Sequence, residues 1–268
     1  VFLGYNAGYS NTASDNVFLG YESGYSNTTG SQSVFIGKMA GRLNTTGYGN
    51  VFIGYQAGGD AVSAENNVFI GTAAGFSNRS GNNVFIGVSS GLLNSTGNCN
   101  SFMGYEAGRL NTTGSSNVFI GKQAGTSNSI GGSNVFIGES AGYSNTSGNN
   151  NTAVGMNAYS TGSYSNSTSL GYWAVISASN QVRIGNNSVT SIGGFTAWSN
   201  LSDKRFKKDV REDVPGLDFI LKLKPVTYQL DVEGLAGFLN MPESCRLKDE
   251  ESIKGLMRQT GFFAQEVE

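Results

Sequence analysis

The sequence has no histidine, and its 268 residues include only two cysteines and three prolines. The absence of histidine excludes histidine-based acid–base catalysis and histidine-ligated metal sites. Cys99 and Cys245 lie in unrelated sequence contexts, so we expect no disulfide between them, and two isolated cysteines do not fix the redox compartment. No apolar run is long enough to span a bilayer, so we expect this segment not to cross a membrane.

Charge is scarce over the first 200 positions, which hold only twelve charged residues, six of each sign. The other 24 charges and all three prolines follow, so composition divides the chain near residue 200. The net charge of −2 gives no sign of a nucleic-acid or anionic-membrane partner. Because Val1 stands inside a repeat, we expect a piece of a longer protein, and a missing signal peptide then carries no weight.

What the first part does contain is a repeat built on a short apolar triplet, as in Asn50-Val51-Phe52-Ile53-Gly54. The glycine after the triplet recurs every 16 or 17 residues, with a last step of 14, at Gly4, Gly20, Gly37, Gly54, Gly71, Gly87, Gly104, Gly121, Gly138, Gly155, Gly171 and Gly185. So short and regular a period predicts a solenoid of stacked repeats. The triplet is typical of a strand, whereas the many glycines disfavour helix. We expect an all-β parallel roll of about twelve coils, two short strands in each, about 55–60 Å long.

Two more positions in the repeat are regular. A second glycine follows the anchor by four residues, as Gly58 follows Gly54, and an asparagine lies ten residues after the first residue of the strand, as Asn44 does. Both residue types tolerate positive φ, so we expect them at the corners of each coil. Stacked asparagines can also hydrogen-bond from coil to coil. One repeat has Ala61 instead of the asparagine.

Side-chain alternation leaves two arrangements of the triplet open. Val51 and Ile53 face one side of the strand and Phe52 the other. We expect the aliphatic residues inside and the phenylalanines outside, along an axis shared with identical chains; the alternative reverses the two. This outer ladder would comprise Phe2, Phe18, Phe35, Phe52, Phe69, Phe85, Phe102, Phe119 and Phe136. The apolar surface of this ladder would exceed roughly 1,000 Å², which is more than a soluble monomer normally exposes as one patch. The alternative arrangement also leaves an apolar ladder exposed. Either way we expect identical chains to cover it.

The pattern decays at the end of the array, where Ala153, Ser169 and Arg183 replace phenylalanine. This predicts a change of cross-section before a connector over residues 194–201. Over residues 1–193 the array resembles the head domain of trimeric autotransporter adhesins, which share an Asn-x-Val-x-Ile-Gly core. The resemblance implies a left-handed parallel β-roll, three chains around one axis and a role in surface binding. The present repeat is longer and has phenylalanine where that family has a small residue.

The remaining residues show mixed patterns. Pro215 can start a short helix ending before Pro225, residues 226–230 alternate like a strand, residues 243–258 suit a loop or solvated helix, and residues 261–267 suit a strand running into a helix. Three stretches are similar to the C-terminal intramolecular chaperone domain first known from phage endosialidases and tail spikes: Ser202-Asp203-x-Arg205-x-Lys207, residues 223–228 and residues 261–267. We therefore expect a partial α+β chaperone domain over residues 202–268, truncated relative to that family.

The resemblance implies that this domain trimerises, guides the fibre into register and then cleaves itself off. It also implies a dyad of Ser202 and Lys207, with scission at or beside Ser202 and Asp203 flanking it. Those residue types suit the chemistry, because a serine needs a base and a lysine with a lowered pKa can be that base. We expect at most this single-turnover autoproteolysis, with no cofactor and no metal.

Together these features predict a segment of a homotrimeric extracellular fibre, on a virion tail or a bacterial surface, that binds a receptor on a host or target cell. A glycan is one candidate, since Tyr5, Tyr21, Tyr55 and Tyr105 could contact sugars, although tyrosines in repeats also serve packing. The alternative is a polysaccharide-degrading tail spike whose catalytic domain lies outside this chain, since the array lacks paired carboxylates. Calcium-binding and ice-binding solenoids are disfavoured, because the array lacks acidic residues at fixed turn positions and a flat Thr-x-Thr face.

Overall fold

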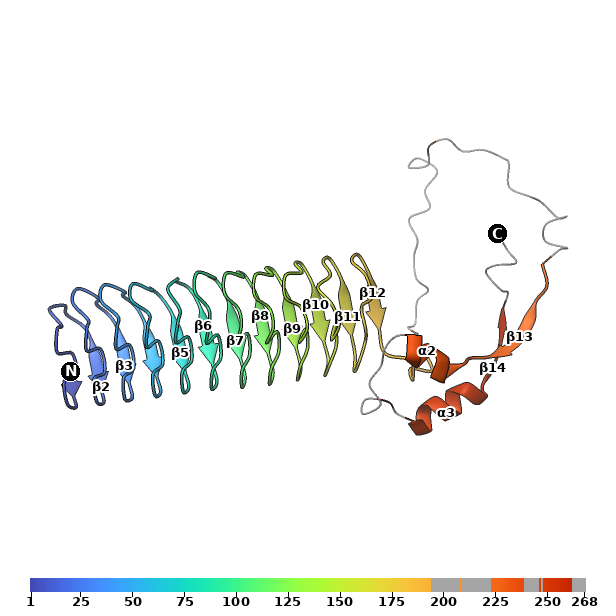
Figure 1. Ribbon diagram of the computed structural model, residues 1–268, viewed down its shortest axis with the longest axis horizontal. Coiled ribbons are helices and arrows are strands. Elements are labelled where there is room, and N and C mark those ends of the chain that lie inside the picture. Colours follow the sequence, from blue (N-terminus) through green and yellow to red (C-terminus); the bar gives the residue numbers. More distant parts are fainter. Residues whose placement is uncertain (194–207, 209–222, 239–245, 247, 262–268) are drawn as a thin grey trace. The chain divides into compact units, whose positions relative to one another are not determined.

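A computed structural model describes residues 1–193, 208, 223–238, 246 and 248–261 of the protein (Figure 1). The chain divides into two compact units, Val1–Asn186 and Asn187–Glu268.

The first unit is a solenoid whose strands form one twelve-stranded parallel sheet in sequence order (Figure 1). Its strands are β1 (Phe2–Leu3), β2 (Val17–Leu19), β3 (Val34–Ile36), β4 (Val51–Ile53), β5 (Val68–Ile70), β6 (Val84–Ile86), β7 (Ser101–Met103), β8 (Val118–Ile120), β9 (Val135–Ile137), β10 (Thr152–Val154), β11 (Thr168–Leu170) and β12 (Val182–Ile184). Equivalent residues pair across neighbouring strands, as Phe35 does with Phe52. The predicted parallel β-solenoid of about twelve repeats is confirmed.

The side of each coil opposite the sheet consists of turns, so the expectation of two strands per coil is wrong for the described array. Backbone bonds still join the coils there, since Gly41 N donates to Ala57 O at 2.9 Å and Leu43 N donates to Gly59 O at 3.0 Å. Directly after β4, Ala57 N donates to Gly54 O, and Gln56 has a φ of 55° within that turn. Because a left-handed residue breaks the extended backbone, this side is hydrogen-bonded without being a strand.

The two regular glycines are required for different reasons. Gly54 has a φ of 135°, and a Cβ there would lie 2.5 Å from the carbonyl oxygen of Gly71 in the next coil. Gly58 has a φ of 59°, and a Cβ there would lie 2.6 Å from the Phe52 ring. The first glycine therefore permits close stacking of coils, and the second makes room for a ring inside the coil.

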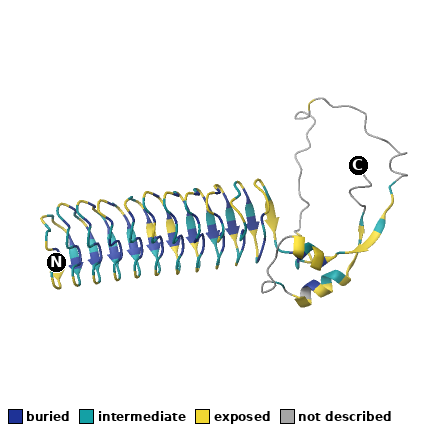
Figure 2. Cartoon of the chain, viewed as in Figure 1, coloured by how far each residue is buried: buried dark blue, intermediate teal, exposed yellow. Residues whose placement is uncertain are grey.

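The phenylalanine ladder lies inside the coil, so our expectation that it faces outward along a trimer axis is wrong. Eight of its rings are fully buried within the single chain: Phe18, Phe35, Phe52, Phe69, Phe85, Phe102, Phe119 and Phe136. Phe2, in the first coil, is half-exposed but stacks on Phe18. Successive rings from Phe2 to Phe136 stack with centroids 4.7–5.0 Å apart. Figure 2 colours the buried residues of the coils dark blue. The facing wall consists of small residues such as Ala57 and Gly58, so only a large side chain from the strand fills the space between them.

Buried asparagines form a second set of ladders, which confirms the predicted bonding from coil to coil. Asn128 Nδ2 donates to Asn111 Oδ1 at 2.9 Å, and Asn145 Nδ2 donates to Asn128 Oδ1 at 2.8 Å. These asparagines do not have the positive φ we expected of corner residues. The second glycine does have positive φ, as Gly58 shows, and among the other residue types positive φ occurs mainly two residues after the anchor glycine and two residues before the strand, as at Gln56 and Asn66.

The interior changes where the repeat decays, as predicted. Ala153 of β10 leaves space that Tyr159 fills from the turn side, and the Tyr159 ring is fully buried 5.8 Å from that of Phe136. The Tyr159 hydroxyl donates to Tyr164 O at 2.5 Å and accepts from Tyr164 N at 2.6 Å. Burial raises the pKa of Tyr159 to about 12.

In the second unit, β13 (Val226–Gln229) pairs antiparallel with β14 (Arg258–Gly261), and the chain between them contains α2 (Val232–Phe238) and α3 (Lys248–Leu256). The predicted strand at 226–230 is confirmed, and α3 confirms the helical alternative for residues 243–258. The sequence did not predict α2. The helix expected from Pro215 and most of the strand expected at 261–267 lie outside the described residues; Gly261 ends β14.

Candidate functional site

The outer face of the long sheet is an apolar surface, which we call the sheet ribbon. It consists of the residues on either side of the central strand position, and its apolar members are Val17, Val34, Val51, Val68, Val84, Val118, Val135 and Val182 in one row and Leu3, Leu19, Ile36, Ile53, Ile70, Ile86, Met103, Ile120, Ile137, Val154, Leu170 and Ile184 in the other. Val84 and Ile120 are each 37% exposed. Within β2–β12 the polar members are Ser101, Thr152 and Thr168, and no member is charged. The ribbon is the apolar ladder that the reversed arrangement of the triplet predicts.

The edge beyond the ribbon carries stacked tyrosines and charged residues. Tyr5 stacks on Tyr21 with ring centroids 5.3 Å apart, and the Lys38 ammonium lies 5.7 Å from the Tyr21 ring and 5.9 Å from the Tyr55 ring. A hydrogen bond to Glu22 raises the pKa of Tyr21. Because Tyr5 stacks on Tyr21 and the Lys38 ammonium lies near both the Tyr21 and Tyr55 rings, the faces of these rings are occupied and their edges and hydroxyls are left for a partner.

A small cavity interrupts the turn side at the fourth coil. Gly59 stands where the neighbouring coils carry Arg42 and Phe76, and a Cβ at Gly59 would lie 2.7 Å from the Phe76 ring. The cavity measures about 160 Å³ and is lined by Met39, Arg42, Leu43, Gln56, Gly59, Asp60 and Phe76. Arg42 is also held by Glu22, whose carboxylate lies 2.8 Å from Nε. Sequence reasoning missed this site, and the signal available was a glycine in a row of large side chains.

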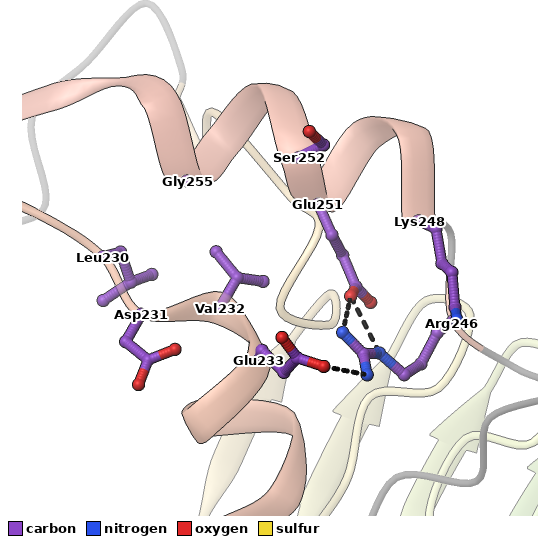
Figure 3. A pocket seen from close by; sticks show the side chains of 9 residues that line it. All are labelled: Leu230, Asp231, Val232, Glu233, Arg246, Lys248, Glu251, Ser252 and Gly255. Atoms are coloured by element: carbon purple, nitrogen blue, oxygen red, sulfur yellow. Dashed lines mark hydrogen bonds and ion pairs between the residues drawn. The ribbon is translucent and has the colours of Figure 1, made fainter.

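A larger cavity of about 360 Å³ lies in the second unit beside α2 and α3 (Figure 3). It is lined by Leu230, Asp231, Val232, Glu233, Arg246, Lys248, Glu251, Ser252 and Gly255. Arg246 donates to the buried Glu251 carboxylate from Nε at 2.9 Å and from Nη2 at 2.7 Å, while Glu233 lies 3.9 Å from Arg246 Nη1. Because both Arg246 donors reach one oxygen of the buried Glu251 carboxylate, this ion pair holds the first turn of α3 against Arg246, which lies two residues before the helix begins.

A second tie of α3 involves Lys254. Its ammonium donates to the carbonyl oxygens of Asn187 and Val189, the latter at 2.6 Å. Burial lowers the pKa of Lys254. The contact fixes α3 to the first residues of its own unit, and the sequence carried no signal of it.

The segment that contains these helices can now be assigned. Residues 202–268 match the family model of the chaperone of endosialidase. The order of a repeat array followed by this chaperone segment is therefore confirmed. Searches of curated proteins and of solved structures find no match.

Within the chaperone segment, the predicted residues Ser202, Asp203 and Lys207 lie outside the described residues, so the dyad stays a prediction. The connector at 194–201 lies outside them as well. In the part of the chain that the structure describes, no group of three or more His, Cys, Asp or Glu side chains could hold a metal ion. Of the helices described, none is long and apolar enough to cross a membrane.

Proposed function

We propose that this chain is a segment of a homotrimeric extracellular fibre, on a phage-type tail or a bacterial surface, whose chaperone segment directs trimerisation and then cleaves itself from the array. The observation that carries the proposal is a uniform solenoid followed along the chain by residues that match the chaperone of endosialidase. The family implies trimer formation, and the solenoid has the elongated, repetitive build of a fibre.

The uniformity of the coils explains why such a fibre needs a chaperone. Six of the twelve strands, β3–β6, β8 and β9, have the same Val-Phe-Ile triplet, and β2 and β7 have close variants of it, so chains that align one coil out of step lose few contacts. A chaperone segment that trimerises first sets the register from one end. Cleavage afterwards removes this template, so chains that came apart could no longer reassemble in register. The assembled fibre then persists because its disassembly is slow.

The proposed cleavage uses Ser202 as nucleophile and Lys207 as general base. Ser202 Oγ attacks the carbonyl carbon of a peptide bond at or beside it, and the neutral Lys207 amine takes the hydroxyl proton. The proton then passes to the leaving amine, and water hydrolyses the resulting ester to a carboxylate and free serine. Arg205 and Lys208 are close in sequence, and their positive charges would lower the pKa of Lys207 and favour its neutral form.

Intact-mass analysis and denaturing gels of the full chain test this cleavage. We expect the wild type to yield a fragment with the mass of the residues upstream of Ser202. Ser202→Ala and Lys207→Ala should stay full-length, while Ser199→Ala, a nearby serine outside the proposed dyad, should cleave like the wild type. Equal full-length bands for the wild type and Ser202→Ala would exclude self-cleavage, and a stable wild-type monomer in sedimentation would exclude the trimeric fibre.

We also assign target binding to the turn side and its edge, where the exposed tyrosines, Arg42 and the 160 Å³ cavity offer hydrogen-bonding groups beside an aromatic ring. These groups suit a hydroxylated partner such as a cell-surface glycan, and the cavity is smaller than sites for drug-sized ligands. Equilibrium binding experiments with purified surface polysaccharide measure the affinity of the chain for such a partner. Unchanged affinity in a Phe76→Ala, Arg42→Ala double variant would exclude the cavity as the binding site.

A further inference from the structure

The sheet ribbon leaves more apolar surface open than a single soluble chain normally carries. Eight of its twenty apolar side chains are at least 36% exposed, and the other twelve are partly exposed. At up to about 50 Å² each they present up to roughly 1,000 Å², whereas the largest patch on a monomer is typically about 300–600 Å². Met103 is the most exposed of its central members, at 47%. A specific interface of standard size buries about 800 Å² per partner, so the ribbon alone is large enough for one.

The composition of the ribbon restricts what can cover it. Over its whole length it presents aliphatic side chains, Met103 and three hydroxyl residues, and no charge for a charged partner to pair with. The twelve charged and most of the large aromatic residues of the array lie elsewhere on the coil or inside it. A partner must therefore be apolar itself and repeat at the spacing of the strands.

We propose that the sheet ribbon is the surface through which copies of this chain pack against one another, in register, along the whole array. This inference rests on the proposed trimeric fibre and names the face that the trimer buries. An identical chain meets both requirements, because its own ribbon is apolar and has the same strand spacing. The arrangement places the sheets of three copies around the axis and turns their charged, tyrosine-bearing edges and turn sides outward.

Two methionines of the wild-type chain provide a matched pair for the test. Met103 lies in the sheet ribbon and is 47% exposed in the single chain, while Met156 follows the anchor glycine of the tenth coil and is 46% exposed. Peroxide oxidises exposed methionine to the sulfoxide, which peptide mass spectrometry quantifies. With the sedimentation state measured on the same sample, we expect slow oxidation of Met103 and fast oxidation of Met156 in the native protein, and equal rates in guanidinium.

Chemical crosslinking provides a second measurement that does not depend on methionine. In a Cys99→Ser, Cys245→Ser background, Ile53→Cys and Ile120→Cys place a thiol on the ribbon. Leu93→Cys and Tyr143→Cys place one on the turn side, where the native residues are each 41% exposed. A short bismaleimide should link pairs of chains through the ribbon positions and leave the turn-side variants as single chains on denaturing gels.

The outcomes separate this inference from the function on which it rests. A trimer in which Met103 and Met156 oxidise at equal rates, or in which only the turn-side cysteines crosslink, overturns the ribbon as the interface and leaves the fibre standing. A wild-type monomer with both methionines reactive overturns both proposals. A trimer with Met103 protected and ribbon-specific crosslinks supports both.

Discussion

At the scale of single residues, the interior of the coil is decided by a balance of volumes between the strand and the turn that faces it. Phe52 fits because Ala57 and Gly58 across from it are small, and a Cβ on Gly58 would meet the ring at 2.6 Å. Val51 and Ile53 then point outward by alternation. Alternation alone separates these two sets and does not say which lies inside. The signal that could have decided it was the Ala-Gly pair, which leaves the interior too empty for an aliphatic row.

The break in the asparagine ladder gives a prediction at the same scale. Asn44 Oδ1 is buried without a hydrogen-bond partner in the described structure, because the next coil has the buried Ala61 where its neighbours have asparagine. In Ala61→Asn, Nδ2 would donate to Asn44 Oδ1, and the new Oδ1 would accept from Asn78. We expect a gain of about 1 kcal/mol, measured as a higher denaturant midpoint in the uncleaved Ser202→Ala background, where unfolding should be reversible.

Ala61→Leu is the apolar control, because its side chain has as many heavy atoms as that of asparagine but is bulkier and has no amide. Overpacking and the missing partner should make this variant less stable than the wild type by about 1–3 kcal/mol. If Ala61→Asn loses as much stability as Ala61→Leu, the site has no room to complete the ladder and the explanation is wrong.

At the scale of elements, the strands could be predicted and the opposite side of the coil could not. The triplet has β-branched and aromatic residues between asparagine and glycine, which is a strong local signal. The turn side depends on positive φ at positions held by residues as different as Gln56, Ala73 and Trp173. Those residue types do not favour such a conformation, so it follows from the stacking of coils and not from local preference. The sequence therefore showed where the chain turns but not how.

Tyr159 provides a pH-dependent prediction for the element that ends the phenylalanine ladder. Burial raises its pKa from 10.0 to about 12, so an unfolded chain loses this phenolic proton at lower pH than the folded one. Between those values the folded state binds more protons, and stability therefore falls as pH rises. The contribution is fully present below pH 10. We expect the free energy of unfolding of the wild type to fall more steeply between pH 10 and 12 than that of Tyr159→Phe.

Urea titrations at a series of pH values measure this difference in slope, with every chain in the uncleaved Ser202→Ala background so that unfolding is reversible. Below pH 10, Tyr159→Phe should be less stable by about 1 kcal/mol, because Tyr164 loses its hydrogen bonds to the hydroxyl, and the gap should narrow towards pH 12. Tyr143→Phe removes an exposed phenol and serves as the control. Parallel pH profiles for the wild type and Tyr159→Phe would contradict the assignment.

At the scale of the whole molecule, the order of the two parts was predictable because each carries its own signal. The fixed spacing of the anchor glycines indicated the solenoid, and three short motifs indicated the chaperone segment that the family match confirms. The shared interface was harder to predict, because it depends on which face of the strand is outside. The Ser202–Lys207 dyad stays a prediction, because a motif specifies residue types and their spacing but does not show whether the two side chains reach the peptide bond that would be cleaved.

The last prediction concerns refolding, and it follows from the sameness of the coils. If the chaperone segment sets the register, chains denatured in guanidinium while they still carry it should return to a native trimer on dilution. Ser202→Ala supplies such chains, because it should stay uncleaved. The cleaved array should instead give soluble aggregates or misregistered assemblies, since its coils pair equally well in several alignments. Circular dichroism and sedimentation of both samples measure the outcome.

Cleaved array that was never denatured should remain folded under the same final conditions, because its persistence depends on the barrier to unfolding. Equal recovery of the cleaved and uncleaved chains would mean that the array finds its register alone, and the chaperone would then need another role.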